Sequence, residues 1–143
     1  MKRQRNSAAA AVHESPARYV ARRNPKLSHV DDALHDPDSG NLDAARIAVR
    51  LGIPLKRLAE AVGYTPQGLL RNPTSDRLQP ALAEIAYILS RLRALLTDER
   101  SIAIWLRAPH PDLGGATPLS LMLSARAAAV IALLHLAESG QTS

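Results

Sequence analysis

The fold of this chain is decided by the stretch NLDAARIAVRLGIPLKRLAEAVGYTPQGLLRNP, residues 41–73, in which helix starts and stops recur at short intervals. Gly52 stands where a first helix ends, in a position that favours the left-handed conformation. Pro54 suits the first turn of a second helix, and Gly63 ends that helix. Thr65, followed by a proline, is a capped start for a third helix. The stretch therefore predicts three short consecutive helices.

Apolar residues in this stretch repeat at helical spacing. In the first helix, Leu42, Ala45 and Val49 stand at i, i+3 and i+7 and are predicted to form the buried face. The third helix is predicted over residues 66–71, since Asn72-Pro73 stops it. The remaining predicted core residues come from the second helix, the turn after it and the third helix. They are Leu55, Leu58, Ala59, Val62, Tyr64 and Leu69.

Two short helices joined by a glycine-containing turn of three or four residues are typical of the helix-turn-helix unit. Ala59 lies four residues before Gly63, and its small side chain lets the third helix cross close to the second. One departure is Asn72, which stands where such units usually carry an apolar residue. The pattern predicts a helix-turn-helix, with an ordinary solvated helical hairpin as the alternative.

In a helix-turn-helix the N-terminal part of the third helix enters the major groove of DNA. Gln67 and Arg71 would then face base edges, glutamine being suited to adenine and arginine to guanine. The other predicted DNA-binding residues lie around that helix, and the three basic ones would contact phosphates; they are Lys56, Arg57, Thr65 and Arg77.

Downstream, four further helices are predicted. Pro80 begins a long connector helix that runs to residue 96. Its predicted buried stripe, at 3.6-residue spacing, is Leu82, Ile85, Ala86, Leu89, Leu92 and Leu96. Thr97 or Asp98 caps the next helix, which Pro109 ends. A loop follows over residues 110–115. The last two helices start at the Thr117-Pro118 pair and at residue 125, the final one running from Ala125 to Glu138.

The final helix is apolar on more than one face. Val130, Ile131 and Leu134 share one face, and Leu133 and Leu136 lie on another. A helix that is apolar all round is normally buried, yet few elements are left at this end to cover it. The helix is either the central core helix or the carrier of a face that awaits a partner.

Upstream, the charges are separated along the chain. Residues 1–26 carry seven Lys or Arg and one acid, and residues 27–42 carry four aspartates and no base. We predict a loosely ordered basic arm, acting as a DNA contact or only as a solvated tail, followed by an acidic linker. His29 and His35 lie among the aspartates without the spacing of a zinc motif, so no metal site is predicted.

Composition limits the function classes. The chain has 143 residues, no cysteine, no phenylalanine and 3% aromatic residues, which favours an all-α fold without disulfides. Its net charge of +5 and pI near 10.2 point to an acidic partner such as nucleic acid. No apolar run suits a membrane span or a signal peptide, so a cytoplasmic location is expected. No catalytic constellation is present, so neither an enzyme nor a cofactor is predicted.

We expect three parts. These are the arm and linker over residues 1–40, the helix-turn-helix module with its connector helix over 41–96, and a C-terminal helical module over 97–143. Gly63 and at least one of Gly114 and Gly115 are expected to have positive φ, where alanine would be strained.

The C-terminal module resembles a known family. Trp105-Leu106, Pro109, the string Leu113-Gly114-Gly115-x-Thr117-Pro118-Leu119 and an apolar helix ending near Gly140 are similar to the toxin-binding domain of Xre/MbcA/ParS-type antitoxins. The helix-turn-helix, with Arg71 and then Arg77-Leu78 before the long helix, resembles the Xre part of that family. Together the resemblance spans residues 42–140.

The resemblance implies a non-enzymatic antitoxin that binds a RES-domain toxin, an enzyme that consumes NAD or transfers ADP-ribose from it. Such antitoxins usually dimerise, and many repress their own operon. We expect the final helix and the polar tail after it to occlude the toxin's active site. The alternative is a stand-alone dimeric transcription regulator with no toxin partner. The predicted partner-binding residues are Trp105, Leu113, Gly114, Leu133, Leu136, Glu138, Ser139, Thr142 and Ser143.

Overall fold

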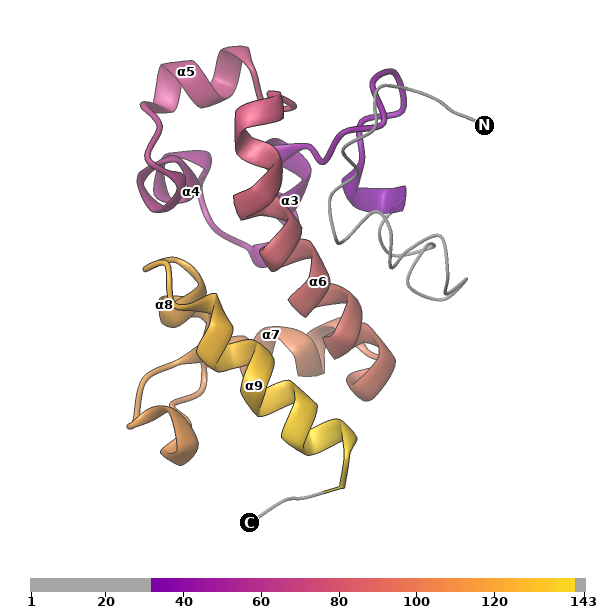
Figure 1. The fold of residues 1–143 in the computed structure, drawn as a ribbon, viewed down its shortest axis with the longest axis vertical. Coiled ribbons are helices and arrows are strands. Elements are labelled where there is room, and N and C mark those ends of the chain that lie inside the picture. Colours follow the sequence, from indigo (N-terminus) through magenta and orange to yellow (C-terminus); the bar gives the residue numbers. More distant parts are fainter. Residues whose placement is uncertain (1–31, 141–143) are drawn as a thin grey trace.

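The computed structural model describes residues 32–140, and this part of the chain is helical throughout, without a β-strand (Figure 1). An isolated antiparallel bridge joins His35 to Leu42. The α-helices are α3 (Ala44–Leu51), α4 (Leu55–Val62), α5 (Pro66–Arg71), α6 (Gln79–Leu96), α7 (Glu99–Arg107), α8 (Pro118–Met122) and α9 (Ala127–Glu138). The described part also contains two short 3₁₀ turns, η1 (Asp76–Leu78) and η2 (Pro111–Leu113), and residues 32–34 are helical. The all-α prediction is confirmed.

The three helices predicted over residues 41–73 are present, and their ends follow the capping residues. The Thr65 hydroxyl accepts a hydrogen bond from the Gly68 amide at 3.0 Å and starts α5. Gly63 ends α4 with φ of +78°. Pro54 precedes α4 as its N-cap and is not its first helical residue. Gly114 and Gly115 also have positive φ, so the prediction for the three glycines is confirmed.

Two glycines with similar backbone angles have different surroundings. Gly52 ends α3 with φ of +72°, and a Cβ built on it would lie 3.0 Å from the guanidinium Nη2 of Arg107. A Cβ on Gly63 would meet nothing within 4 Å. The two positions therefore separate backbone strain from a side-chain contact.

We expect Gly63→Ala to destabilise the chain by about 1 kcal/mol, because alanine is strained at positive φ. Gly52→Ala should cost more, since it also displaces Arg107 from the end of α3. Urea denaturation of both variants measures the difference in the free energy of unfolding. Equal losses of unfolding free energy in the two variants would mean that Arg107 moves aside freely. A urea midpoint that Gly63→Ala leaves unchanged would exclude backbone strain at Gly63.

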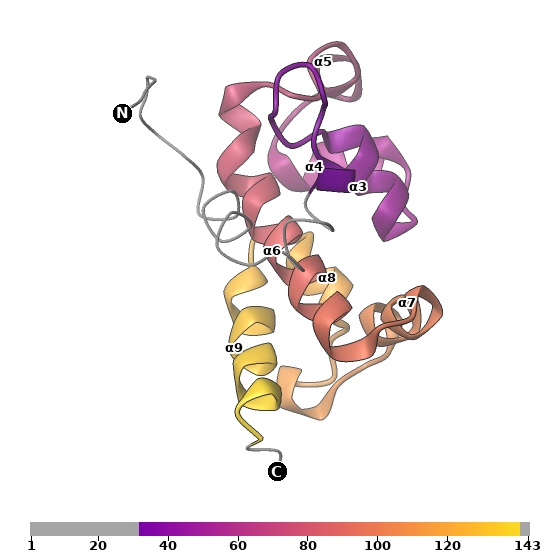
Figure 2. The ribbon, with the colours of Figure 1, turned by 90° about the vertical axis from the view of Figure 1, so that its right-hand side faces the viewer.

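Helix α6 is the centre of the fold. It packs against α3 on the N-terminal side and against α7 and α9 on the C-terminal side, and both ribbon views show it spanning the two halves (Figures 1 and 2). One continuous apolar core therefore extends across residue 96. The α6 side chains buried in this core are Leu82, Ala83, Ile85, Ala86, Ile88, Leu89 and Leu92.

The predicted buried face of the first helix was wrong. Ala45 is exposed and Val49 is 81% exposed, while Leu42 is buried but lies before the helix, in the bridge to His35. The reason is that α3 begins only at Ala44, so a different stripe faces the core. The buried residues of α3 are Ala44, Ile47, Ala48 and Leu51.

Residues 32–40 correct the prediction of a loosely ordered acidic linker. Leu34 is 1% exposed and packs in the main core. Asp36 turns the chain, accepting a hydrogen bond from the Ser39 amide at 2.9 Å, and this bond holds the pKa of its carboxyl below the ordinary value. This half of the linker is part of the folded domain, because one apolar side chain anchors it. The basic arm lies outside the described residues.

The start of the last helix also differs from the prediction. Ala125 has φ of +63° and lies in a turn, so α9 begins two residues later, at Ala127. The long connector helix begins at Gln79, one residue before Pro80. Asp98, and not Thr97, caps α7, since its carboxylate accepts a hydrogen bond from the Arg100 amide at 3.1 Å.

Candidate functional site

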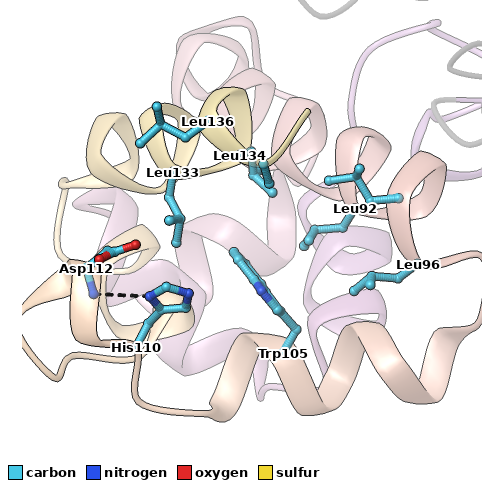
Figure 3. Close-up of a pocket in the computed structure, with 10 residues that line it drawn as sticks. Leu92, Leu96, Trp105, His110, Asp112, Leu133, Leu134 and Leu136 are labelled. Atoms are coloured by element: carbon cyan, nitrogen blue, oxygen red, sulfur yellow. Dashed lines mark hydrogen bonds between the residues drawn. The ribbon is translucent and has the colours of Figure 1, made fainter. Parts of the chain in front are cut away.

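A pocket of about 520 Å³ opens between the end of α6, the end of α7 and the last two turns of α9. Eight of its ten lining residues are apolar, and His110 and Asp112 are the other two. Trp105 stands between His110 and the α6 residues Leu92 and Leu96 (Figure 3). We call this hollow the C-terminal pocket, and its lining residues are Leu92, Leu95, Leu96, Trp105, His110, Asp112, Leu133, Leu134, Leu136 and Ala137.

The loop after α7 fixes the polar edge of the C-terminal pocket. The Asp112 amide donates a hydrogen bond to His110 Nδ1 at 3.2 Å, which caps η2. The His110 backbone amide donates to Ala116 and its carbonyl accepts from Gly115, at 3.1 and 3.0 Å. The positive φ of Gly114 and Gly115 lets the chain close this loop. The histidine side chain is therefore held by its own loop.

Helix α9 is fastened to α6 by polar contacts. Arg91 forms an ion pair with Glu138, the last residue of α9, and the exposed fractions of the two side chains are 26% and 18%. The Tyr87 hydroxyl lies 3.2 Å from His135 Nε2, and the Arg91 guanidinium lies 6.0 Å from the centre of the Tyr87 ring. These contacts hold the part of α9 that lines the C-terminal pocket.

Helix α7 is joined to α3 at both of its ends. Arg107 donates hydrogen bonds to the carbonyls of Leu51 and Gly52 at 2.7 and 3.2 Å, which suits a cation at a helix C-terminus. Glu99, at the other end of α7, lies 3.0 Å from Arg93 and 3.9 Å from Arg50. The position of Trp105 therefore depends on contacts with the N-terminal half.

The start of α7 depends on the ionised Asp98 carboxylate. The Ser101 hydroxyl donates to it at 2.7 Å and the Arg100 amide at 3.1 Å, and these bonds hold the pKa of Asp98 below its ordinary value. A carboxyl with a lowered pKa in the folded state stabilises that state above its unfolded pKa. The contribution is lost as the pH falls through the folded pKa.

Asp98→Ala is therefore expected to lower the melting temperature at pH 7. The gap in melting temperature to the parent chain should narrow as the pH falls below the ordinary aspartate pKa of about 4 and then through the lower pKa of the folded carboxyl. Asp98→Asn is the matched control, because asparagine caps a helix without titrating. Calorimetric scans from pH 7 to pH 3 measure the gap, and a gap independent of pH would exclude the carboxylate as its cause.

The structure brings only some of the predicted partner-binding residues together. Trp105, Leu133 and Leu136 line the C-terminal pocket. Leu113 and Gly114 lie in the loop below it, Leu113 half-buried against the core and Gly114 exposed. These two therefore shape the loop without lining the pocket.

The predicted tail residues are distributed differently. Glu138 was expected in a flexible tail, but it is part of α9 and is paired with Arg91, because the helix continues to that residue. Ser139 caps the end of α9, and its hydroxyl donates to the Leu136 carbonyl at 3.0 Å. Thr142 and Ser143 lie outside the described residues.

The predicted DNA-binding residues are all exposed. Gln67 and Arg71 lie four residues apart on α5, so they share one face of that helix. Thr65 uses its hydroxyl oxygen to cap α5. Within residues 32–140 no ion pair engages the basic side chains of this set, which are Lys56, Arg57, Arg71 and Arg77.

Sequence reasoning missed several residues of the site. His110 and Asp112 were placed in a loop with no role, and Leu92 and Leu96 were assigned to the core alone. The ion pair of Arg91 with Glu138 joins residues 47 apart, and no local pattern signals such a pair. The one local signal is Leu95, a large apolar residue outside the predicted stripe of the long helix. The structure leaves it 40% exposed.

Residues 91–140 match the family model of the antitoxin Xre/MbcA/ParS C-terminal toxin-binding domain. The C-terminal segment belongs to this antitoxin family. The comparisons with curated proteins and with solved structures found no match. All ten residues that line the C-terminal pocket lie within the matched toxin-binding domain. The family supports an antitoxin role, with a toxin as the partner.

In residues 32–140 no helix has the length and apolar character that a membrane crossing needs.

Proposed function

We propose that this antitoxin neutralises a RES-domain toxin that consumes NAD or transfers ADP-ribose. The observation that carries the proposal is the C-terminal pocket, an open apolar surface that lies wholly inside the toxin-binding domain. The resemblance of the Leu113-Gly114-Gly115-x-Thr117-Pro118 string supplies the toxin class. The chain itself contributes no chemistry, because inhibition requires only binding and blocking.

Occlusion of the toxin's active site is the proposed mechanism. A cleft that binds NAD must offer hydrogen-bond donors to phosphates and ribose. Such donors can also donate to the hydroxyl oxygens of serine and threonine. Ser139 and the tail residues Thr142 and Ser143 supply those hydroxyls directly after α9. Glu138 is excluded from this role by its ion pair with Arg91. The antitoxin would thus dock through its helices and block through its tail.

Co-expression with the protein encoded by the neighbouring open reading frame, which we expect to be a RES-domain toxin, tests the proposal. We expect cells that produce the toxin alone to lose NAD and stop growing, and cells that produce both to keep their NAD. A tagged antitoxin should retain the toxin in a pull-down. Toxicity that persists when both proteins are present would contradict the proposal, as would a RES-domain protein that is not retained.

We also propose that a homodimer of the antitoxin represses its own operon through α5. Gln67 and Arg71 are exposed on one face of that helix, and the exposed basic residues around it can contact phosphates. The alternative, a stand-alone dimeric helix-turn-helix regulator, shares this surface. It gives no reason for a toxin-binding domain, so the family match favours the antitoxin.

A further inference from the structure

We infer that the C-terminal pocket is the receptor for a bulky apolar side chain of the toxin, and that His110 Nε2–H holds a hydrogen-bond acceptor beside that side chain. The inference rests on the proposed function and deepens it. The inference distinguishes two contacts between the toxin and the antitoxin in one complex. The toxin inserts a side chain into the antitoxin, and the antitoxin tail enters the toxin elsewhere.

The apolar lining defines the first requirement for the occupant. Leucines from α6 and α9 and the ring of Trp105 form the walls (Figure 3). Two of the lining leucines, Leu95 and Leu136, are 40% and 46% exposed. An exposed apolar hollow of this kind marks an interaction site in a soluble protein. Anchor residues that fill such hollows are usually large and become fully desolvated. The volume of about 520 Å³ leaves room for a large side chain and part of its backbone.

The polar edge defines the second requirement. His110 Nδ1 accepts the Asp112 amide at 3.2 Å, so this nitrogen carries no proton in the neutral ring. The proton must then be on Nε2, which lies on the side of the ring away from Asp112, where Trp105 stands (Figure 3). No hydrogen bond within residues 32–140 uses Nε2 or the Trp105 indole N–H. The pocket therefore offers donors, and its occupant should present a carbonyl or another acceptor.

The toxin, and not a second copy of this chain, is the occupant that the observations favour. Every lining residue lies in the domain whose family binds toxins. Polar contacts on both sides of the pocket also hold its walls in place. The Arg91–Glu138 ion pair holds α9, and the Arg107 bonds to the end of α3 hold α7. A preformed receptor loses less freedom on binding than one that must be ordered by its ligand.

The chain offers a reporter of pocket occupancy, because Trp105 is its only tryptophan. Antitoxin labelled with 5-fluorotryptophan should give one ¹⁹F resonance from the folded protein. Adding the purified, unlabelled RES-domain toxin should shift this resonance. An unshifted resonance in a complex that forms would overturn the inference.

Two substitutions alter the C-terminal pocket without a change in the core. Ala137→Phe fills the pocket from an exposed helical position, and Leu133→Glu places a charge on its wall. We expect each to raise the dissociation constant for the toxin by about 30-fold or more, as the loss of an anchor contact does. Val49→Glu is the matched control, since Val49 is 81% exposed on α3, outside the toxin-binding domain. It should change the constant by no more than about twofold.

Isothermal titration with the purified toxin measures these constants, and circular dichroism confirms that each variant is folded. Toxin binding that survives both pocket variants would overturn the inference while leaving the antitoxin function in place. Absence of binding by the parent chain would reject the proposed function, and the inference with it. A change of oligomeric state in the pocket variants, with toxin affinity kept, would assign the pocket to a second copy and overturn the inference.

Discussion

An antitoxin shortened to end at Gly140 should still bind its toxin but should no longer protect cells from it. The deletion removes residues 141–143, and with them the hydroxyls of Thr142 and Ser143, two of the three that we propose bind in the toxin's cleft. It leaves α9, the Arg91–Glu138 ion pair and the lining of the C-terminal pocket in place. The expected effect is a complete loss of rescue, read as plating efficiency and cellular NAD. A pull-down should show the toxin still retained.

A shorter chain that ends at Leu136 makes a useful comparison, because it removes two more kinds of contact. Ala137 lines the pocket, and Glu138 pairs with Arg91, so this chain should lose affinity as well as rescue. Glu138→Gln in the full chain is the control for the ion pair alone, and it should keep rescue. Full protection by the chain that ends at Gly140 would exclude the tail as the blocking element. Inhibition would then be a property of the helix surfaces.

Much of the fold could be predicted because helix ends depend on local chemistry. Thr65, Gly63 and Thr117 act within three or four residues of their own position, and each ends or begins a helix where the sequence places it. The apolar spacing of α4 and α6 was also sufficient to identify their buried faces. These are interactions at short sequence separation, which a single sequence contains.

The face of α3 and the packing of residues 32–40 required tertiary information. Leu42 and Val49 match a helical spacing, but the chain folds Leu42 into a bridge before the helix begins, so Val49 turns to solvent. Leu34 reaches the core from an acidic stretch that composition alone assigns to solvent. One large apolar side chain was enough to order that stretch, and average composition does not register it.

The candidate site was predicted in part for the same reason. Leu133 and Leu136 stood out on a helix without an obvious cover, and Trp105 stood out in the family resemblance. The structure brings all three to one pocket. The partners that hold the pocket are 47 and 56 residues apart in sequence, in the pairs Arg91–Glu138 and Arg107–Leu51. Nothing local marks those pairs, since Arg91, Arg107 and Glu138 are ordinary charged residues in a helical pattern. Leu51 takes part only through its backbone carbonyl, which no sequence pattern signals.

Replacing Arg71 by alanine should weaken operator binding by about 5- to 150-fold, if its guanidinium reads a guanine through two hydrogen bonds. The side chain is exposed at the end of α5 and belongs to no ion pair within residues 32–140, so the loss should appear in affinity and not in stability. Gel shifts with the operator and with an unrelated DNA duplex distinguish base-specific contacts from sequence-independent binding to the DNA backbone. The loss should be confined to the operator.

Lys56→Ala is the matched variant for a phosphate contact, since Lys56 is exposed on α4 and should touch only the DNA backbone. It should weaken binding to both duplexes alike and reduce the slope of affinity against salt concentration by about one. Unchanged operator affinity in Arg71→Ala would show that α5 does not read bases through this residue. A parent chain with no salt-sensitive DNA binding would reject autorepression altogether. The antitoxin role would stand, because the residues that line the C-terminal pocket lie on α6, α7, α9 and the loop after α7, and none of them is on α5.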